Sequence, residues 1–134
     1  DYLAKQLKSI VDPDLVVMAE KNSKPIGFAL SLPDINIPLK YNKSGALLPG
    51  IFHLLTKKKK INQVRIITLG VIKEFQRGGT ASVLFLETAN RAIAKGYYQG
   101  EASWILEDNV MMNRSAEMLN SVRYKTYRVY EESF

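Results

Sequence analysis

The segment Leu69-Gly-Val-Ile-Lys-Glu-Phe-Gln-Arg-Gly-Gly-Thr-Ala81 joins an apolar strand to an apolar helix through two adjacent glycines. Glycine lets the backbone turn sharply and leaves its N–H groups open to a ligand. We expect Thr80 to cap the following helix, whose first N–H groups have no partner within the helix. Because those groups lie at the positive end of the helix dipole, the turn predicts an anion site, and the usual anion of a strand-turn-helix is a phosphate.

The rest of the chain places this turn in an alternation of strands and helices. The spacing of apolar residues predicts helices over 2–11, 80–95 and 111–121, and strands over 15–20, 25–32, 63–72, 102–106 and 124–131. A strand-helix-strand unit that follows an antiparallel hairpin implies an α/β fold, with a mixed central sheet and helices on both faces. The length of 134 residues suits one domain over 1–134.

Residues 34–62 form an unusually long connection for a compact domain. We expect a helix near 50–58, with the segment folded across a binding cleft. In the simplest interpretation its apolar side chains cover the sheet and the lysines of 57–60 face water. Two alternatives stay open: the apolar patch lines a pocket for an acyl chain or acceptor, or it lies on an anionic membrane surface. The patch consists of Leu47, Leu48, Ile51, Phe52 and Leu55.

Composition excludes several kinds of chemistry. The chain has no cysteine, which removes disulfides, thiolate metal sites and a cysteine nucleophile. Its one histidine, His53, lies in an apolar run, where packing is a better interpretation than catalysis. We therefore expect no metal site. We also expect no transmembrane segment, since no run of about 18 apolar residues occurs.

The net charge of +6 suits an anionic partner: nucleic acid, a membrane surface or a phosphorylated cofactor. The lysines of 57–60 have no aromatic residues among them, so we do not expect nucleic acid. A basic nucleic-acid-binding module nevertheless stays open as a third hypothesis.

Two common phosphate-binding motifs do not fit the glycine turn. A nucleoside-triphosphate loop would need a lysine after the second glycine, where Thr80 stands. A dinucleotide fold would need G-x-G-x-x-G, which is absent. A tight turn without a ligand remains the simpler alternative.

The sequence resembles the GNAT superfamily of acyl-CoA-dependent N-acyltransferases over residues 14–131. The matching cofactor motif is Leu69-x-Val71 followed by Gln76-x-x-Gly79-x-Ala81. The block 104–109, followed by Asn113-x-x-Ala116-x-x-Leu119, and the ending 124–131 look like a bacterial branch of GNAT-like proteins. In that branch this region is typically the C-terminal part of a longer protein, and the first strand and helix of the fold would lie upstream of Asp1.

The resemblance implies a cytoplasmic enzyme that uses acetyl-CoA, or another acyl-CoA, and an amine-bearing acceptor. It implies that the backbone of Leu69 and Val71 pairs with the pantetheine arm, and that Asn113 contacts this arm. The thioester would lie in a slot between splayed parallel strands, 65–72 and 101–106. The pyrophosphate would be held by the amides of Gln76, Arg77, Gly78, Gly79, Thr80 and Ala81.

Direct transfer needs a base for the amine, a donor to the oxyanion and an acid for the leaving thiolate. We expect the Val71 N–H to serve the oxyanion and Glu107, at the end of a strand, to serve as base. A solvent-facing or capping role explains Glu107 equally well. Asn120 stands where many relatives carry the tyrosine acid, so Tyr124, Tyr127 or water would have to replace it. A domain that binds acyl-CoA without turnover is the competing hypothesis.

Overall fold

The computed structural model describes residues 11–132. They divide into a first unit that ends at Trp104 and a second unit that begins at Ile105. The helix predicted over 2–11 lies outside the described residues, apart from Val11.

The first unit is built on a mixed sheet with the strand order β1-β2-β3-β4. The first three strands are antiparallel neighbours, whereas β3 and β4 are parallel. The predicted α/β class, the hairpin and the mixed sheet are therefore confirmed. The strands are β1 (Val16–Lys21), β2 (Lys24–Pro33), β3 (Gln63–Val71) and β4 (Gln99–Ala102). The helical segments are η1 (Pro13–Leu15), α2 (Asn36–Leu39), α3 (Leu47–Lys57), η2 (Lys58–Lys60), η3 (Lys73–Phe75), α4 (Thr80–Ala94) and α5 (Val110–Met118).

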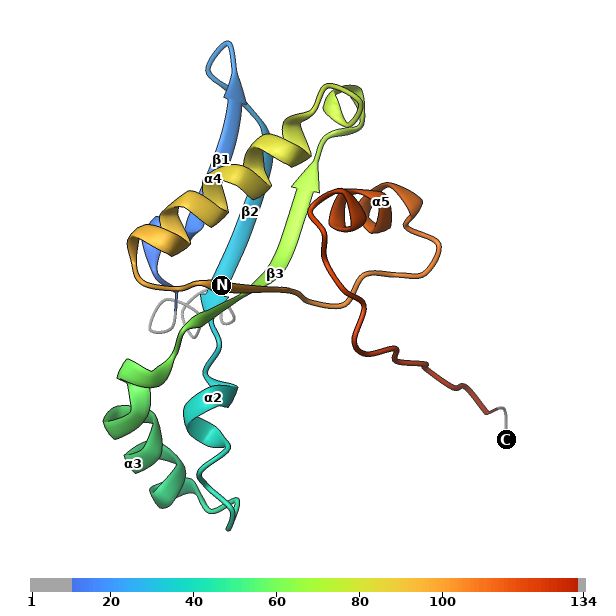
Figure 1. Cartoon of the computed structure of the whole chain (residues 1–134). Helices are drawn as coiled ribbons and strands as arrows, with labels where there is room; N and C mark the ends of the chain where they lie inside the picture. Colours follow the sequence, from blue (N-terminus) through green and yellow to red (C-terminus); the bar gives the residue numbers. More distant parts are fainter. Residues whose placement is uncertain (1–10, 133–134) are drawn as a thin grey trace. The chain divides into compact units, whose positions relative to one another are not determined.

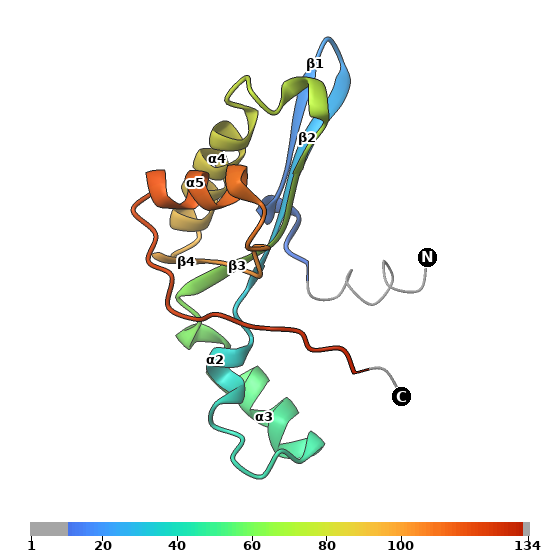
Figure 2. The same cartoon turned by 90° about the vertical axis from the view of Figure 1, so that its right-hand side faces the viewer.

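Helix α4 lies across one face of the sheet and builds the core there (Figures 1 and 2). Near its start, Leu84 packs with Val17 and Ala29, and near its end Ala92 packs with Leu15 and Val64. These six side chains are all buried, so the face of α4 that contacts the sheet excludes water near both ends of the helix. Burial of this apolar surface fixes the direction of α4, and therefore the position of the glycine turn at its first residue.

A β-bulge in β3 separates the part of the strand that pairs with β4 from the part that does not. Leu30 and Ser31 of β2 lie opposite Thr68 and Ile66, so Ile67 is the extra residue. The ladder between β3 and β4 ends at this point, where Ile66 lies opposite the last residue of β4. Beyond the bulge, β3 continues to Val71 without a partner strand on its β4 side among the described residues.

Two predicted strands differ from the structure. The strand expected over 102–106 is β4, which ends at Ala102 because β3 bends away at its bulge. The strand expected over 124–131 is wrong, since residues 121–132 form no helix or strand. The tyrosines and the valine of this segment favour extended backbone, but a strand forms only where a neighbour completes its hydrogen bonds.

The segment after β2 also differs from its prediction. The helix expected near 50–58 is present as α3, but the apolar patch does not cover the sheet and is exposed. Figures 1 and 2 show α2 and α3 extending beyond the end of the sheet where β3 begins, whereas the glycine turn follows the other end of β3. The interpretations of a cover for the sheet and of a segment across the cleft are therefore wrong.

In the second unit, both ends of α5 are capped. The Asn109 side chain accepts a hydrogen bond from the Met112 N–H at 3.2 Å. At the other end, the N–H of Asn120 donates to Glu117 at 2.9 Å and that of Ser121 donates to Ala116 at 3.1 Å. With Asn120 at φ +56°, these bonds form a Schellman cap, which suits asparagine because it tolerates left-handed backbone. This cap ends the helix three residues before the predicted Ser121.

We expect Gly27→Ala to destabilise the first unit. A Cβ at Gly27 would lie 2.9 Å from the Gly70 carbonyl oxygen and 3.2 Å from a Leu84 methyl carbon. Relieving this overlap would cost about 1–3 kcal/mol, because α4 and the strands must shift. Chemical denaturation measures the loss. Gly100→Ala is the matched control, since a Cβ there meets nothing within 4 Å; equal unfolding free energies for the two variants would contradict the packing described.

We expect Asn120→Tyr to loosen the end of α5 and Asn120→Gly to preserve it. A tyrosine in the left-handed region costs about 1–2 kcal/mol, whereas glycine adopts it without strain. Hydrogen exchange of the residue 120 and Ser121 amides by NMR measures the difference. Equal protection in both variants would show that the cap does not depend on the residue at 120.

Candidate functional site

The turn before α4 depends on the conformation of Gly79. Its φ of +77° lies in the left-handed region that favours glycine, and Gly79 occupies the N-cap position of the helix. Its carbonyl accepts the first helical hydrogen bond, from the Val83 N–H at 3.1 Å. The prediction that Thr80 caps α4 is therefore wrong: Thr80 is the first helical residue, and the cap has no side chain.

Two of the predicted phosphate-binding amides are already engaged. The Gln76 N–H donates to the Lys73 carbonyl at 3.4 Å, and the Gly78 N–H donates to the Phe75 carbonyl at 3.2 Å. Both bonds stabilise the short helix η3 that precedes the turn.

Four other predicted amides point to no partner among the described residues. They are the N–H groups of Arg77, Gly79, Thr80 and Ala81. Three of them lie at the N-terminal end of α4, where the helix dipole adds positive potential. This end of α4 therefore presents bare donors of the kind that hold phosphate oxygens.

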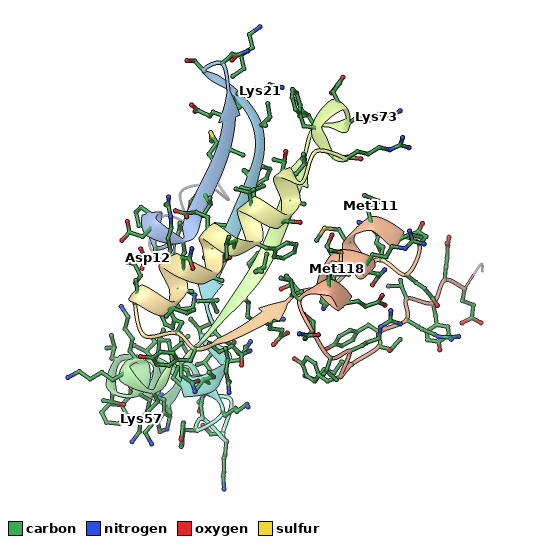
Figure 3. The ribbon with its side chains drawn as sticks, turned by 45° about the horizontal axis from the view of Figure 1, so that its top comes forward. Asp12, Lys21, Lys57, Lys73, Met111 and Met118 are labelled. Atoms are coloured by element: carbon green, nitrogen blue, oxygen red, sulfur yellow. The ribbon has the colours of Figure 1, made fainter. Side chains whose placement is uncertain are left out.

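Cationic side chains surround the turn. Lys73 and Arg77 are exposed, and Glu74 is the one acidic residue between Lys73 and Ala81. The Lys21 ammonium lies 5.1 Å from the centre of the Phe75 ring and stacks beside η3. Figure 3 shows Lys21 and Lys73 at the same end of the first unit, far from Lys57. The charge around the bare amides thus favours an anionic ligand.

The open edge of β3 leads into this turn. The Ile72 N–H donates to the Ile26 carbonyl in β2 at 2.9 Å. Because backbone groups alternate in direction along a strand, those of Leu69 and Val71 face the opposite edge. Their side chains pack toward the core beside Leu84. The structure therefore leaves these two backbones at the edge from which β4 has departed, as the predicted role of Leu69 and Val71 requires.

The Gln76 side chain connects the strand edge to the turn. Its Nε2 donates to the Val71 carbonyl at 3.0 Å. This bond uses the acceptor of Val71 and leaves the N–H of that residue as the group available at the edge. Gln76 thus positions the turn against the end of β3.

Three predicted site residues, Glu107, Asn113 and Tyr124, belong to the second unit. The Asn113 side-chain amide donates to the Leu106 carbonyl and to the Asn109 carbonyl, both at 3.0 Å. Asn113 therefore holds the turn that contains Glu107 against the first residues of α5.

Glu107 and Tyr124 are both exposed. Glu107 lies in a turn five residues beyond the end of β4, so its predicted place at a strand end is wrong. Tyr124 lies in the extended segment that follows α5. Asn120, at the position where many relatives have the tyrosine acid, serves as the helix-ending residue of α5.

Sequence reasoning missed two features of the site. The bulge at Ile67 gives no signal, because the strand is apolar without interruption on both sides of it. Lys73 has a weak signal, since it is the first cation after the strand and precedes the turn directly.

The described part of the chain has neither a membrane-spanning helix nor a cluster of metal ligands. None of its helices is long and apolar enough to cross a membrane. Residues 11–132 also contain no group of three or more histidine, aspartate or glutamate side chains arranged to hold a metal ion.

Two bacterial proteins are similar to this chain in sequence, although no protein-family model matches it. A bacterial ceramide synthase of Caulobacter vibrioides (strain NA1000 / CB15N) is 38% identical over 138 residues, which cover 98% of this chain and 36% of that protein. Protein YghO of Escherichia coli (strain K12) is 33% identical over 137 residues, covering 97% and 35%. The chain thus spans about a third of the length of these curated relatives.

Solved structures match the fold over nearly all of the chain. Aminoglycoside N-acetyltransferase AAC(6')-Iy, in complex with CoA, has a TM-score of 0.61 at 17% identity, covering 99% of this chain and 90% of that one. The same enzyme with a bisubstrate analogue has a TM-score of 0.62 at 16% identity, covering 99% and 79%. This chain therefore has the fold of the GNAT N-acetyltransferases.

Proposed function

We propose that this chain transfers an acyl group from an acyl-CoA to an amine by direct attack. One observation carries the proposal: a strand edge with unpaired backbone runs directly into a helix start with bare amides and a cationic surround. That combination suits a ligand with an amide-containing arm and an anionic phosphate end, which is the chemistry of CoA.

The two parts of the cofactor would use different groups. The pyrophosphate would accept hydrogen bonds from the amides of Arg77, Gly79, Thr80 and Ala81, with Gly78 allowing close approach of the backbone. The pantetheine amides would pair with the β3 backbone at Leu69 and with the Val71 carbonyl, which can accept a second hydrogen bond beside that of Gln76, so the Val71 N–H stays available for the thioester oxygen. Structures of AAC(6')-Iy with CoA and with a bisubstrate analogue support a CoA co-substrate.

In the reaction, the amine nitrogen attacks the thioester carbonyl carbon and a C–N bond forms. The carbonyl oxygen becomes an oxyanion, for which the Val71 N–H is the proposed donor. The amine proton passes to Glu107, and the C–S bond breaks to release the CoA thiolate. Tyr124 or water returns a proton to that thiolate. Since the chain itself has no cysteine, we propose direct attack by the amine rather than transfer through a cysteine-linked acyl group on this chain.

The acceptor is proposed to be a long-chain amine. One relative bears the name bacterial ceramide synthase, and a ceramide is an amide of a fatty acid with a sphingoid amine. That relative is 38% identical, whereas the aminoglycoside-acetylating neighbours share the fold at 13–17%. The proposal covers acyl groups from acetyl to long-chain. We also propose that the reaction takes place in the cytoplasm.

Binding of acyl-CoA without turnover is the second candidate function. Asn120 favours it, because an asparagine amide cannot protonate a thiolate and here it ends a helix. Calorimetry with acetyl-CoA and palmitoyl-CoA, followed by a thiol-release assay over aminoglycoside and sphingoid amines, separates the two functions. Turnover with any amine supports the transferase, and binding without turnover supports the second candidate.

We expect Gly79→Glu to abolish CoA binding and Gly79→Ala to weaken it far less. Both variants carry the strain of left-handed backbone, about 1–2 kcal/mol, so their melting temperatures should fall together. Only the glutamate places a carboxylate among the bare amides, where it repels a diphosphate. Isothermal calorimetry with acetyl-CoA measures affinity, and unchanged affinity in Gly79→Glu would contradict the assigned phosphate site.

We expect Glu107→Gln to lower kcat by about 10²–10⁴-fold with little change in CoA affinity. Glutamine keeps the size of the side chain but cannot accept the amine proton. Tyr124→Phe, measured beside it, should lower kcat only if the phenol supplies the thiolate proton. If Glu107→Gln turns over as fast as the parent chain, Glu107 is not the base.

A further inference from the structure

The arm, residues 36–60, presents an exposed apolar surface. It consists of α2, α3 and η2. Five apolar side chains of α3 are exposed by 47 to 79%: Leu47, Leu48, Ile51, Phe52 and Leu55. Since about 100° separates successive residues of a helix, these five fall within one stripe, an arc of roughly 140°.

The opposite side of α3 is the side that packs. Gly50 is buried, and a Cβ there would lie 2.9 Å from the Asn42 side-chain nitrogen, so the helix approaches the preceding loop closely. The His53 ring lies near two aromatic rings, 6.2 Å from Tyr41 in a tilted contact and 5.9 Å from Phe52 in an edge-to-face contact. The helix therefore packs through Gly50, with His53 and Leu54 half-buried, and turns its apolar stripe outward, the reverse of an ordinary surface helix.

The arm also carries charge equal to the whole net charge of the chain. It holds six lysines and no aspartate or glutamate, so the remaining residues have equal numbers of acidic and basic side chains. The ammonium groups of Lys57 and Lys60 lie 5.7 and 5.1 Å from the centre of the Tyr41 ring, whereas Lys58 and Lys59 are exposed. Apolar and cationic groups are thus adjacent on one protruding element.

The base of the arm is fixed to the sheet by polar contacts. The Asp34 N–H donates to the Gln63 carbonyl at 2.9 Å, and the Asp34 carboxylate accepts from Asn36 at the start of α2. Gln63 Nε2 also donates to Glu101 at 3.0 Å, and Glu101 pairs with Arg65 at 3.0 Å. This network joins β3, β4 and α2, so the arm leaves the sheet in a defined direction.

We propose that the arm docks on the surface of an anionic lipid bilayer. Its leucines, isoleucine and phenylalanine would enter the acyl boundary while its lysines meet the headgroups, as in interfacial amphipathic helices. A second copy of the chain fits less well, because two arms of equal positive charge repel each other. Nucleic acid would neutralise the lysines but leave the apolar stripe in water. This docking goes beyond acyl transfer and does not depend on it.

The experiment is cosedimentation of the whole chain with vesicles. One set is phosphatidylcholine alone, and the other contains 30 mol% phosphatidylglycerol. We expect binding to the anionic vesicles that falls with added salt, and binding to the neutral vesicles at least about tenfold weaker.

Two pairs of variants test the two surfaces separately. Leu48→Ser/Phe52→Ser should reduce binding to background, whereas Leu86→Ser/Ile93→Ser, which removes two exposed apolar side chains from α4, should bind as the parent chain does. Lys58→Gln/Lys59→Gln should weaken binding by tenfold or more, since each lysine near the surface contributes roughly fivefold. Lys24→Gln/Arg123→Gln removes the same charge elsewhere and should leave binding unchanged.

Several outcomes would overturn the proposal. They are no binding to anionic vesicles, equal binding to neutral vesicles, and equal loss in an arm variant and its control. Two further measurements identify other partners if the vesicles do not bind. In sedimentation velocity, a dimer that Leu48→Ser/Phe52→Ser dissociates would assign the arm to a second copy of the chain. With a labelled 30-nucleotide RNA, binding that Lys58→Gln/Lys59→Gln removes would assign it to nucleic acid. Circular dichroism confirms that each variant is folded.

Discussion

The parting of β3 and β4 is the constraint on which the proposed site depends. The two strands pair up to Ile66 and Ala102, and the extra residue Ile67 then turns β3 away. Backbone N–H and C=O groups that lose a partner strand must find another partner or remain in water. The bulge therefore leaves backbone N–H and C=O groups of β3 without a partner strand next to the folded core. Such an exposed edge is a liability for a protein unless a ligand or another segment pairs with it.

The glycine turn extends this edge. η3 ends at Phe75 and α4 begins at Thr80, with the left-handed backbone of Gly79 at the N-cap position, so only a short turn separates η3 from the bare amides of the helix start. The Gln76 amide joins the two features by its bond to the Val71 carbonyl. Burial of Leu84 and Ala92 against the sheet keeps α4 in place, so the proposed anion site rests on the main core rather than on a loop.

The distribution of charge separates two surfaces of the first unit. Outside the arm, acidic and basic residues are equal in number, and Asp12 and Asp14 both pair with Lys95 at 2.7 Å. This pairing raises the pKa of Lys95 to about 12, through hydrogen bonds from the ammonium to both carboxylates. The arm has no acidic residue, and its exposed lysines, such as Lys58 and Lys59, face water on the element that also carries the apolar stripe. The arm thus combines an exposed apolar stripe with lysines that have no acidic residue beside them in its sequence, which distinguishes it from an ordinary solvated loop.

The sequence alone determined the strand-turn-helix around Gly79, the hairpin, α3 and the α/β class, because apolar periodicity, glycine and turn residues act over a few neighbours. It predicted the strands at 102–106 and 124–131 incorrectly, because a strand ends or fails according to the backbone beside it, and that neighbour is distant in sequence. The same reason explains why the predicted positions of Thr80 and Glu107 are wrong. Thr80 as a helix cap and Glu107 at a strand end both depend on where a helix or strand begins or ends, and the structure places those boundaries at other residues. Only the tertiary structure decided that the apolar patch of α3 faces outward, since helical spacing shows that a stripe exists but not which element, if any, covers it.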